Sequence, residues 1–160
     1  MYDFAPDTDA LPEERYRQLG QAAAALIEGE SDAVANMANL AALLWEFIPR
    51  MNWAGFYRVI GDELVLGPFV GRPACIRIPM GQGVCGTAAA TGETQLVLDV
   101  HAFPGHIACD AVTRSEVVVP VLRDGKVIAV IDCDSPDEAR FEEADARGLE
   151  ALARLISAHI

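Results

Sequence analysis

The sequence predicts one α+β domain, in which helices at both ends of the chain pack on an antiparallel sheet of about six strands. The chain has 160 residues, of which 52% are hydrophobic and 22% are charged, so it can bury one core. Its two ends carry apolar residues at steps of three and four, and its middle consists of short runs rich in Val, Ile and aromatic residues. We therefore treat residues 1–160 as a single domain, with helices at about 11–48, sheet and loops at about 52–134, and a last helix at about 141–159.

Two helices are expected in the N-terminal third. The first runs from Leu11 to about Gly29, because glycine is a frequent C-terminal cap. The second begins after Ser31-Asp32, which offers an N-cap, and ends before Pro49. Its apolar residues recur at helical spacing: Val34, Met37, Leu40, Leu43, Leu44 and Phe47.

The middle of the chain alternates short strands with turn residues. The first two strands form a hairpin around Gly61-Asp62, and the last two form a hairpin around Asp124-Gly125. The six expected strands comprise residues 52–60, 63–69, 74–78, 95–97, 116–122 and 126–134.

Three other segments complete the expected fold. A glycine-rich loop at 81–86 leads into a short helix at 87–91, and residues 99–113 are expected to be irregular. The last helix is amphipathic and ends the domain. Its expected inner face comprises Leu149, Leu152, Leu155 and Ile156.

The charge balance restricts the possible partners. Lys and Arg number 12 against 24 Asp and Glu, which gives a net charge of −12, and the basic residues are scattered along the chain. We therefore expect neither nucleic acid nor an anionic membrane as a partner, and we expect a ligand that carries a positive group. No export signal and no apolar run long enough to cross a bilayer is visible, so we expect a cytoplasmic protein.

The four cysteines lack the paired C-x2-C spacing that is typical of structural zinc. A metal shared by His106 and Cys109 is a minor alternative, and a small buried hydrophobe is the common role of any single cysteine. Cys85 and Cys109 lie in loops near Gly, His and Pro, so we expect them to be accessible. Cys133 alternates with acids on the last strand and is expected to be structural.

Three carboxyl groups are candidates for a buried cluster. Asp132 and Asp134 lie two apart on one strand, so they share a face. A bulged three-residue turn would place Glu116 opposite Asp132, whereas a two-residue turn would place it opposite Cys133. The first register predicts a cluster in which at least one pKa is raised, which supplies a proton donor and carboxylates for an ammonium group. The simpler alternative is a strand end that emerges into water.

Aromatic residues on the first strand suggest one wall of a site. Trp53 and Tyr57 are four apart and share a face, whereas Phe56 is expected in the core. Thiols, an acid cluster and an aromatic wall together indicate two-electron redox chemistry on a small cationic or zwitterionic ligand. A non-catalytic sensor of a small zwitterion and a metal-binding regulator are the alternatives.

Several strings then carry a resemblance to a known family. They are NWAGFY at 52–57, LGPF at 66–69, ACIRIP at 74–79, GVCGTA at 83–88, DVHAFPGHIACD at 99–110 and RSE at 114–116. Together they resemble the free methionine-(R)-sulfoxide reductase family, which is built on a GAF domain. The resemblance extends from the first strand to the last helix. One departure is Cys133, where that family commonly has an aliphatic residue.

The resemblance implies a role for each of the other thiols. Cys109 matches the nucleophile, Cys75 matches the thiol that resolves the intermediate as a disulfide, and Cys85 matches an additional or alternative resolving thiol. Which of the two resolves the intermediate stays open at this point.

The resemblance also implies how a substrate is held. The acids that match the substrate-binding and proton-donating cluster are Glu116, Asp132 and Asp134, and the residues that match the wall around the methyl group are Trp53 and Tyr57. The implied reaction reduces free L-methionine (R)-S-oxide to L-methionine through a sulfenic acid and an intramolecular disulfide. Thioredoxin would supply the electrons, so no cofactor and no metal is expected. We also expect a homodimer, because two helices beside a sheet offer a face for a second copy.

Overall fold

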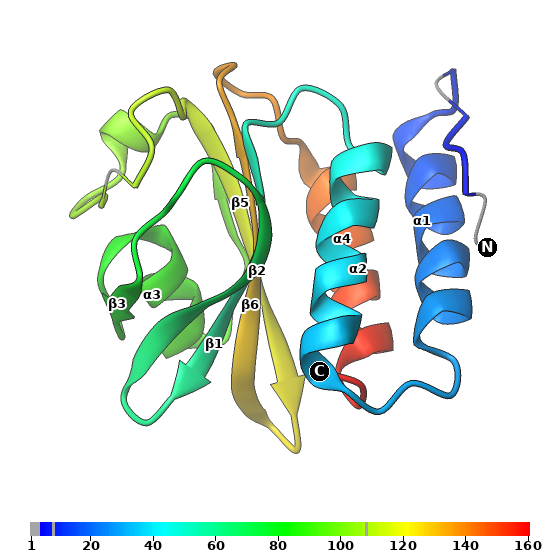
Figure 1. Cartoon of the computed structure of the whole chain (residues 1–160). Coiled ribbons are helices and arrows are strands. Elements are labelled where there is room, and N and C mark those ends of the chain that lie inside the picture. The colour runs from blue at the N-terminus through cyan, green and yellow to red at the C-terminus, as the bar shows by residue number, and fades with distance from the viewer. Residues whose placement is uncertain (1–3, 8, 108) are drawn as a thin grey trace.

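The computed structural model describes residues 4–7, 9–107 and 109–160. These residues form a six-stranded antiparallel sheet between two layers, as Figure 1 shows. Helices α2 and α4 cover one face of the sheet, with α1 packed on their outer side, and α3 with the adjoining loops covers the other face. The predicted α+β class is thereby confirmed.

Of the three helices on this side of the sheet, α2 and α4 begin where the sequence supplies capping side chains, whereas α1 begins at a proline. They comprise α1 (Pro12–Ile27), α2 (Ala33–Phe47) and α4 (Glu143–Ile156). The carboxylate of Asp32 accepts a hydrogen bond from the backbone of Ala35 at 2.8 Å and so caps α2, as its position in the sequence predicts. In the capping box of α4, the Asp145 side chain accepts from the backbone of Glu142.

The strands occur in the order β3-β2-β1-β6-β5-β4. Their bounds are β1 (Trp53–Ile60), β2 (Glu63–Gly71), β3 (Arg77–Pro79), β4 (Gln95–Val97), β5 (Ser115–Arg123) and β6 (Lys126–Ser135). The two long hairpins, β1–β2 and β5–β6, are therefore joined through β1 and β6 in the centre of the sheet.

The register of the β5–β6 hairpin differs from both predicted alternatives. Asp124 and Gly125 have φ of 52° and 75°, so the turn contains two residues. A bulge then adds one residue to β6, because Val121 pairs with Ala129 whereas Leu122 pairs with Val127.

The bulge restores the alternation of faces that the three-residue turn would have given. Glu116 pairs with Asp134, and Asp132 pairs with Val118. The three acids therefore share one face, as predicted, although Glu116 is opposite neither Asp132 nor Cys133. The extra residue, Ile128, packs on the helical side and not on the acid face where the uninterrupted alternation puts it.

The sheet separates two hydrophobic clusters. The larger cluster lies between the sheet and helices α1, α2 and α4, and it includes Phe56 and Cys133. The smaller cluster lies under α3 (Gly83–Thr91) and includes Trp53, Tyr57 and Cys85. Cys133 is fully buried on the side away from the acids, which is the position predicted for it.

Three local predictions are wrong. The third strand occupies Arg77–Pro79 rather than 74–78, because residues 72–76 cross over Tyr57, whose hydroxyl donates to the carbonyl of Cys75 at 2.9 Å. Helix α3 begins at Gly83, inside the segment predicted as a loop. Leu155 is 39% exposed and does not belong to the inner face of α4. No helix among the described residues has the length and hydropathy needed to span a membrane.

Candidate active site

A small pocket opens between α3, the loop after β4 and the acid face of the sheet. It contains most of the predicted site residues: Tyr57, Cys85, Cys109, Glu116, Asp132 and Asp134. Its volume is about 30 Å³, which is room for about two water molecules and far less than a free amino acid needs. The pocket has this size while Cys109 is part of a disulfide.

Two of the three acids on this face are removed from water, and the third, Asp134, is half-buried. Glu116 and Asp132 are 7% and 5% exposed, and neither takes part in an ion pair within the described part of the chain. Burial, reinforced by the neighbouring carboxyl groups, holds the pKa values of Glu116 and Asp134 well above their usual range. Burial also raises the pKa of Asp132 to about 7, so the cluster retains protons near neutrality.

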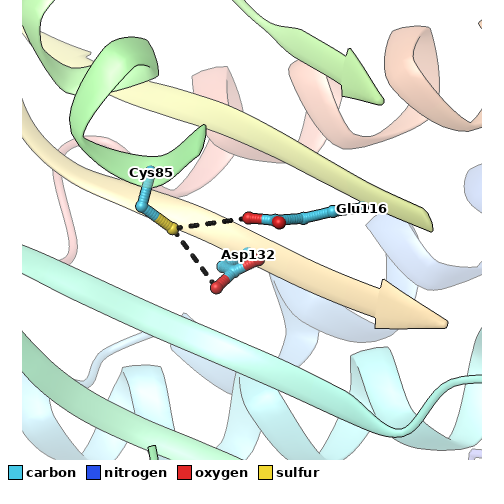
Figure 2. A group of neighbouring side chains, drawn as sticks. All are labelled: Cys85, Glu116 and Asp132. Atoms are coloured by element: carbon cyan, nitrogen blue, oxygen red, sulfur yellow. Dashed lines mark hydrogen bonds between the residues drawn. The ribbon is translucent and has the colours of Figure 1, made fainter. Parts of the chain in front are cut away.

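Cys85 points into the same cluster from the first turn of α3. Its sulfur lies 3.2 Å from Oδ2 of Asp132, to which the thiol donates, and 3.9 Å from Oε1 of Glu116 (Figure 2). Burial and the two acids raise the pKa of this thiol well above its ordinary value. Cys85 is only 4% exposed, so the prediction of an accessible thiol is wrong for this residue.

Two glycines beside Cys85 explain how the helix approaches so closely. Gly83 has φ +63°, and a Cβ there would lie 3.2 Å from the Ile107 side chain. A Cβ on Gly86 would lie 2.5 Å from the carbonyl oxygen of Pro79. The glycine-rich segment therefore serves close packing of α3 against the sheet and the neighbouring loop.

Cys75 and Cys109 form a disulfide with Cα atoms 5.4 Å apart. Cys109 lines the pocket, and Cys75 belongs to the segment that crosses Tyr57. Because both sulfurs are bonded to each other, Cys109 is not available in this state for the metal that it was considered to share with His106. The His106 ring instead packs edge-on against His101, and burial together with that ring lowers its pKa.

The aromatic wall has the predicted members and one more. Trp53 stacks on Tyr57 with ring centroids 5.8 Å apart, and Phe69 stacks on Trp53 at 5.1 Å. Tyr57 lines the pocket, whereas Trp53 is behind it and donates from Nε1 to the carbonyl of Arg72. Burial and nearby Asp132 raise the pKa of Tyr57, so its hydroxyl stays protonated.

A hydrogen-bonded group beside Cys109 was not predicted from the sequence. The side-chain amide of Asn52 donates to Asp110 at 3.2 Å and to Thr113 at 2.9 Å, and Thr113 contacts Asp134. The backbone of Asn52 also donates to the carbonyl of Asp134 at 2.9 Å. This group anchors the loop that carries Cys109 to the ends of β1 and β6. The only signals for it were the places of Asn52 at the start and Asp110 at the end of two of the strings quoted above.

The amino-acid sequence is similar to those of known proteins along most of its length. The GAF domain family model matches residues 13–160. The free methionine-R-sulfoxide reductase of Escherichia coli is 49% identical over 87% of this chain and 84% of its own length. The yeast free methionine-R-sulfoxide reductase from Saccharomyces cerevisiae is 46% identical over 91% of this chain and 85% of its own.

A solved structure gives the same result in three dimensions. The free methionine-R-sulfoxide reductase from Neisseria meningitidis, determined in complex with its substrate, superimposes with a TM-score of 0.94 and 44% identity. The alignment covers 99% of this chain and 95% of that one.

Proposed function

The chain belongs to the free methionine-R-sulfoxide reductase family of GAF domain proteins and is an oxidoreductase, and we propose that it reduces free L-methionine (R)-S-oxide to L-methionine. The observation that carries the proposal is the position of Cys109. This residue lines the pocket, pairs with Cys75, and lies on the same pocket as a buried acid cluster. A nucleophile, a resolving thiol and a proton source therefore share one small volume.

The first step uses the thiol of Cys109 and a proton from the acid cluster. The thiolate attacks the sulfoxide sulfur while the cluster protonates the sulfoxide oxygen. Two electrons pass from the thiol to the sulfoxide, the oxygen ends on Cys109 as a sulfenic acid, and free methionine leaves. The cluster suits this task because the pKa of Asp132 is about 7. The pKa values of its two neighbours, Glu116 and Asp134, are also raised well above their usual range.

The second step uses Cys75. Its thiol condenses with the sulfenic acid, releases water, and forms the disulfide present in this structure. A dithiol such as reduced thioredoxin would then exchange with the disulfide and become oxidised itself. No other cofactor enters this cycle. Because the cycle needs a supply of reducing dithiol, we place the protein in the cytoplasm.

The acid cluster also accounts for a preference for the free amino acid. The buried carboxyl groups have no cationic partner among the described residues, so the α-ammonium of the substrate supplies one. A methionine sulfoxide residue inside a peptide lacks that ammonium and would leave buried acids unpaired. We also propose a homodimer through the outer face of α1 and α4, where Leu155 is exposed, to be checked by sedimentation.

A coupled assay tests the activity. Purified protein is mixed with racemic free methionine sulfoxide, thioredoxin, thioredoxin reductase and NADPH, and NADPH oxidation is followed. We expect consumption that stops near half of the substrate, is lost in Cys109→Ser and persists in Cys133→Ala, a cysteine on the other side of the sheet. No consumption together with stoichiometric binding of the sulfoxide by calorimetry would identify a sensor instead of a reductase.

A further inference from the structure

We propose that Cys85, Glu116 and Asp132 form a binding site for one thiophilic divalent cation of the Zn²⁺ or Cd²⁺ class, which competes with the substrate. The metal site is argued from the geometry of the three side chains. The competition rests on the proposed function, because it assumes that the same acids receive the substrate's ammonium.

The spacing of the three ligand atoms fits a tetrahedral ion. One sulfur and two carboxylate oxygens all lie within 4.8 Å of one another. Zinc bonds of about 2.3 Å to sulfur and about 2.1 Å to oxygen at a tetrahedral angle place sulfur and oxygen about 3.6 Å apart. The observed distances of 3.2 Å and 3.9 Å from the sulfur of Cys85 lie on either side of that value. Shifts of a few tenths of an ångström would therefore bring both sulfur–oxygen distances to that value.

The ligands come from three different elements, which makes the arrangement rigid. Cys85 is on α3, Glu116 is on β5 and Asp132 is on β6, and Figure 2 shows the sulfur pointing toward both carboxyl groups. All three residues are buried. The second oxygen of Asp132, Oδ1, is buried and has no hydrogen-bond partner among the described residues, so this carboxylate has an unused acceptor.

The charges and donor types favour a soft dication. A thiolate and two carboxylates bring three negative charges to a place where the ion pairs of the described residues supply no positive one. A divalent ion offsets two of these charges, and the proton of the thiol, together with any proton that the two carboxyl groups hold, leaves to solvent on binding. Thiolate sulfur selects Zn²⁺ and Cd²⁺ over Mg²⁺ and Ca²⁺, which prefer oxygen alone. Water or Asp134, on the same pocket, would complete four ligands.

The experiment uses the full chain with Cys75→Ser and Cys109→Ser. This variant cannot turn over or form the disulfide, and Cys85 and Cys133 are its remaining thiols. Cadmium is added, and the ultraviolet charge-transfer band from thiolate to cadmium is recorded. We expect saturation at one ion per chain, loss of the band when Cys85→Ser is added, and an unchanged band when Cys133→Ala is added instead. Magnesium should produce no displacement of cadmium.

The carboxylates are tested in the same background. Glu116→Gln and Asp132→Asn should each weaken cadmium binding at least about tenfold, because each removes a charged ligand. Circular dichroism checks that the variants fold, and the Glu116→Gln result stands if Asp132→Asn does not fold. A band that survives Cys85→Ser, or that disappears in Cys133→Ala, would overturn the site.

Competition is measured as the apparent Kd of cadmium with free methionine sulfoxide present. At ten times the Kd of the sulfoxide, the apparent Kd of cadmium should rise about elevenfold. An unchanged cadmium Kd with sulfoxide bound would overturn the competition. If calorimetry detects no sulfoxide binding, the proposed function fails, and the cadmium band still decides the metal site by itself.

Discussion

Cys75 and Cys109 are bonded to each other across 34 residues of sequence, with Cα atoms 5.4 Å apart. Cys85, the third thiol on this side of the sheet, is instead directed at the carboxyl groups of Glu116 and Asp132. The sequence left open which thiol resolves the sulfenic acid on Cys109. The observed pairing favours Cys75, and it leaves Cys85 as a protonated neighbour of the acids.

The two candidate resolving thiols should behave differently when each is removed. In Cys75→Ser, one methionine should form per chain in a single burst, and the thioredoxin-dependent steady rate should fall at least about tenfold, because the sulfenic acid has no partner thiol. In Cys85→Ala, the Cys75–Cys109 disulfide should still form after one turnover. Quenched reactions analysed by chromatography and peptide mass spectrometry measure both. A Cys85–Cys109 disulfide in the wild-type protein would contradict this assignment.

Removing a charge from the acid cluster should weaken substrate binding. In Asp134→Asn, the loss of a charge-assisted contact of about 1.5–3 kcal/mol with the ammonium predicts a KM raised about 10- to 150-fold. Asp137→Asn is the matched control, because Asp137 is at the surface, where it pairs with Arg50 at 2.9 Å. Steady-state kinetics on free methionine sulfoxide separate KM from kcat. An equal rise of KM in both variants would argue against the cluster as the ammonium site.

The buried acids should make the protein less stable as pH rises. The folded pKa of Asp132 is about 7 against an ordinary value of 3.8, so in this range the folded state keeps a proton that the unfolded state has released. The free energy of unfolding should therefore fall between pH about 4 and about 7, by up to about 1.4 kcal/mol per pH unit for each such group. Urea unfolding of the disulfide form at several pH values measures the slope.

Two isosteric variants, one in the cluster and one at the surface, test whether the buried acids cause this pH dependence. Asp132→Asn should reduce the slope, whereas Asp137→Asn at the surface should leave it unchanged. A stability that rises through the same range would show that the acids are ionised in the folded protein.

The disulfide form should not bind substrate. Its pocket of about 30 Å³ is too small for a free amino acid, so reduction of Cys75–Cys109 must precede binding. Calorimetry with L-methionine, the product, should detect binding to the protein reduced with a phosphine and none to the oxidised protein. Equal affinity in both states would show that the pocket opens without reduction of the disulfide.

Two helical glycines offer a matched test of the packing of α1 on α4. A Cβ at Gly148 would lie 2.1 Å from the Tyr16 ring, so Gly148→Ala should destabilise the fold by about 1–3 kcal/mol. No atom of the described residues lies within 4 Å of a Cβ at Gly20, so Gly20→Ala should stabilise α1 by about 1 kcal/mol. Thermal unfolding of both variants gives the comparison, and a shift of the same sign in both would contradict it.

Local signals predicted most of the fold. Ser31-Asp32 marked the start of α2 because a capping side chain acts on its own turn, and Asp124-Gly125 marked the β5–β6 hairpin. The bulge at Ile128 could not be predicted, because an extra apolar residue in an apolar strand has no sequence signature. The three acids were still assigned to one face. The bulge adds one residue to β6 and the expected three-residue turn would have added one residue to the loop, so either one turns the side chain of Glu116 to the same face as those of Asp132 and Asp134.

The site was harder to predict because it depends on contacts between distant segments. The glycines around Cys85 suggested an open loop, but Gly83 and Gly86 bring α3 against Ile107 and the carbonyl of Pro79, which buries the thiol. Asn52 shows the same limit, because its bonds to Asp110 and Thr113 span about sixty residues of sequence.

The alternation along β6 has a consequence for how this protein can change. Asp132 and Cys133 are adjacent in sequence, yet the first belongs to the pocket and the second to the core under the helices. Substitutions under α1, α2 and α4 can therefore tune the melting temperature while leaving the chemistry intact, whereas substitutions on the opposite face act on ligand choice and on the smaller hydrophobic cluster together. A laboratory lineage evolved for a new small-molecule substrate should accumulate its mutations on those two faces in separate rounds.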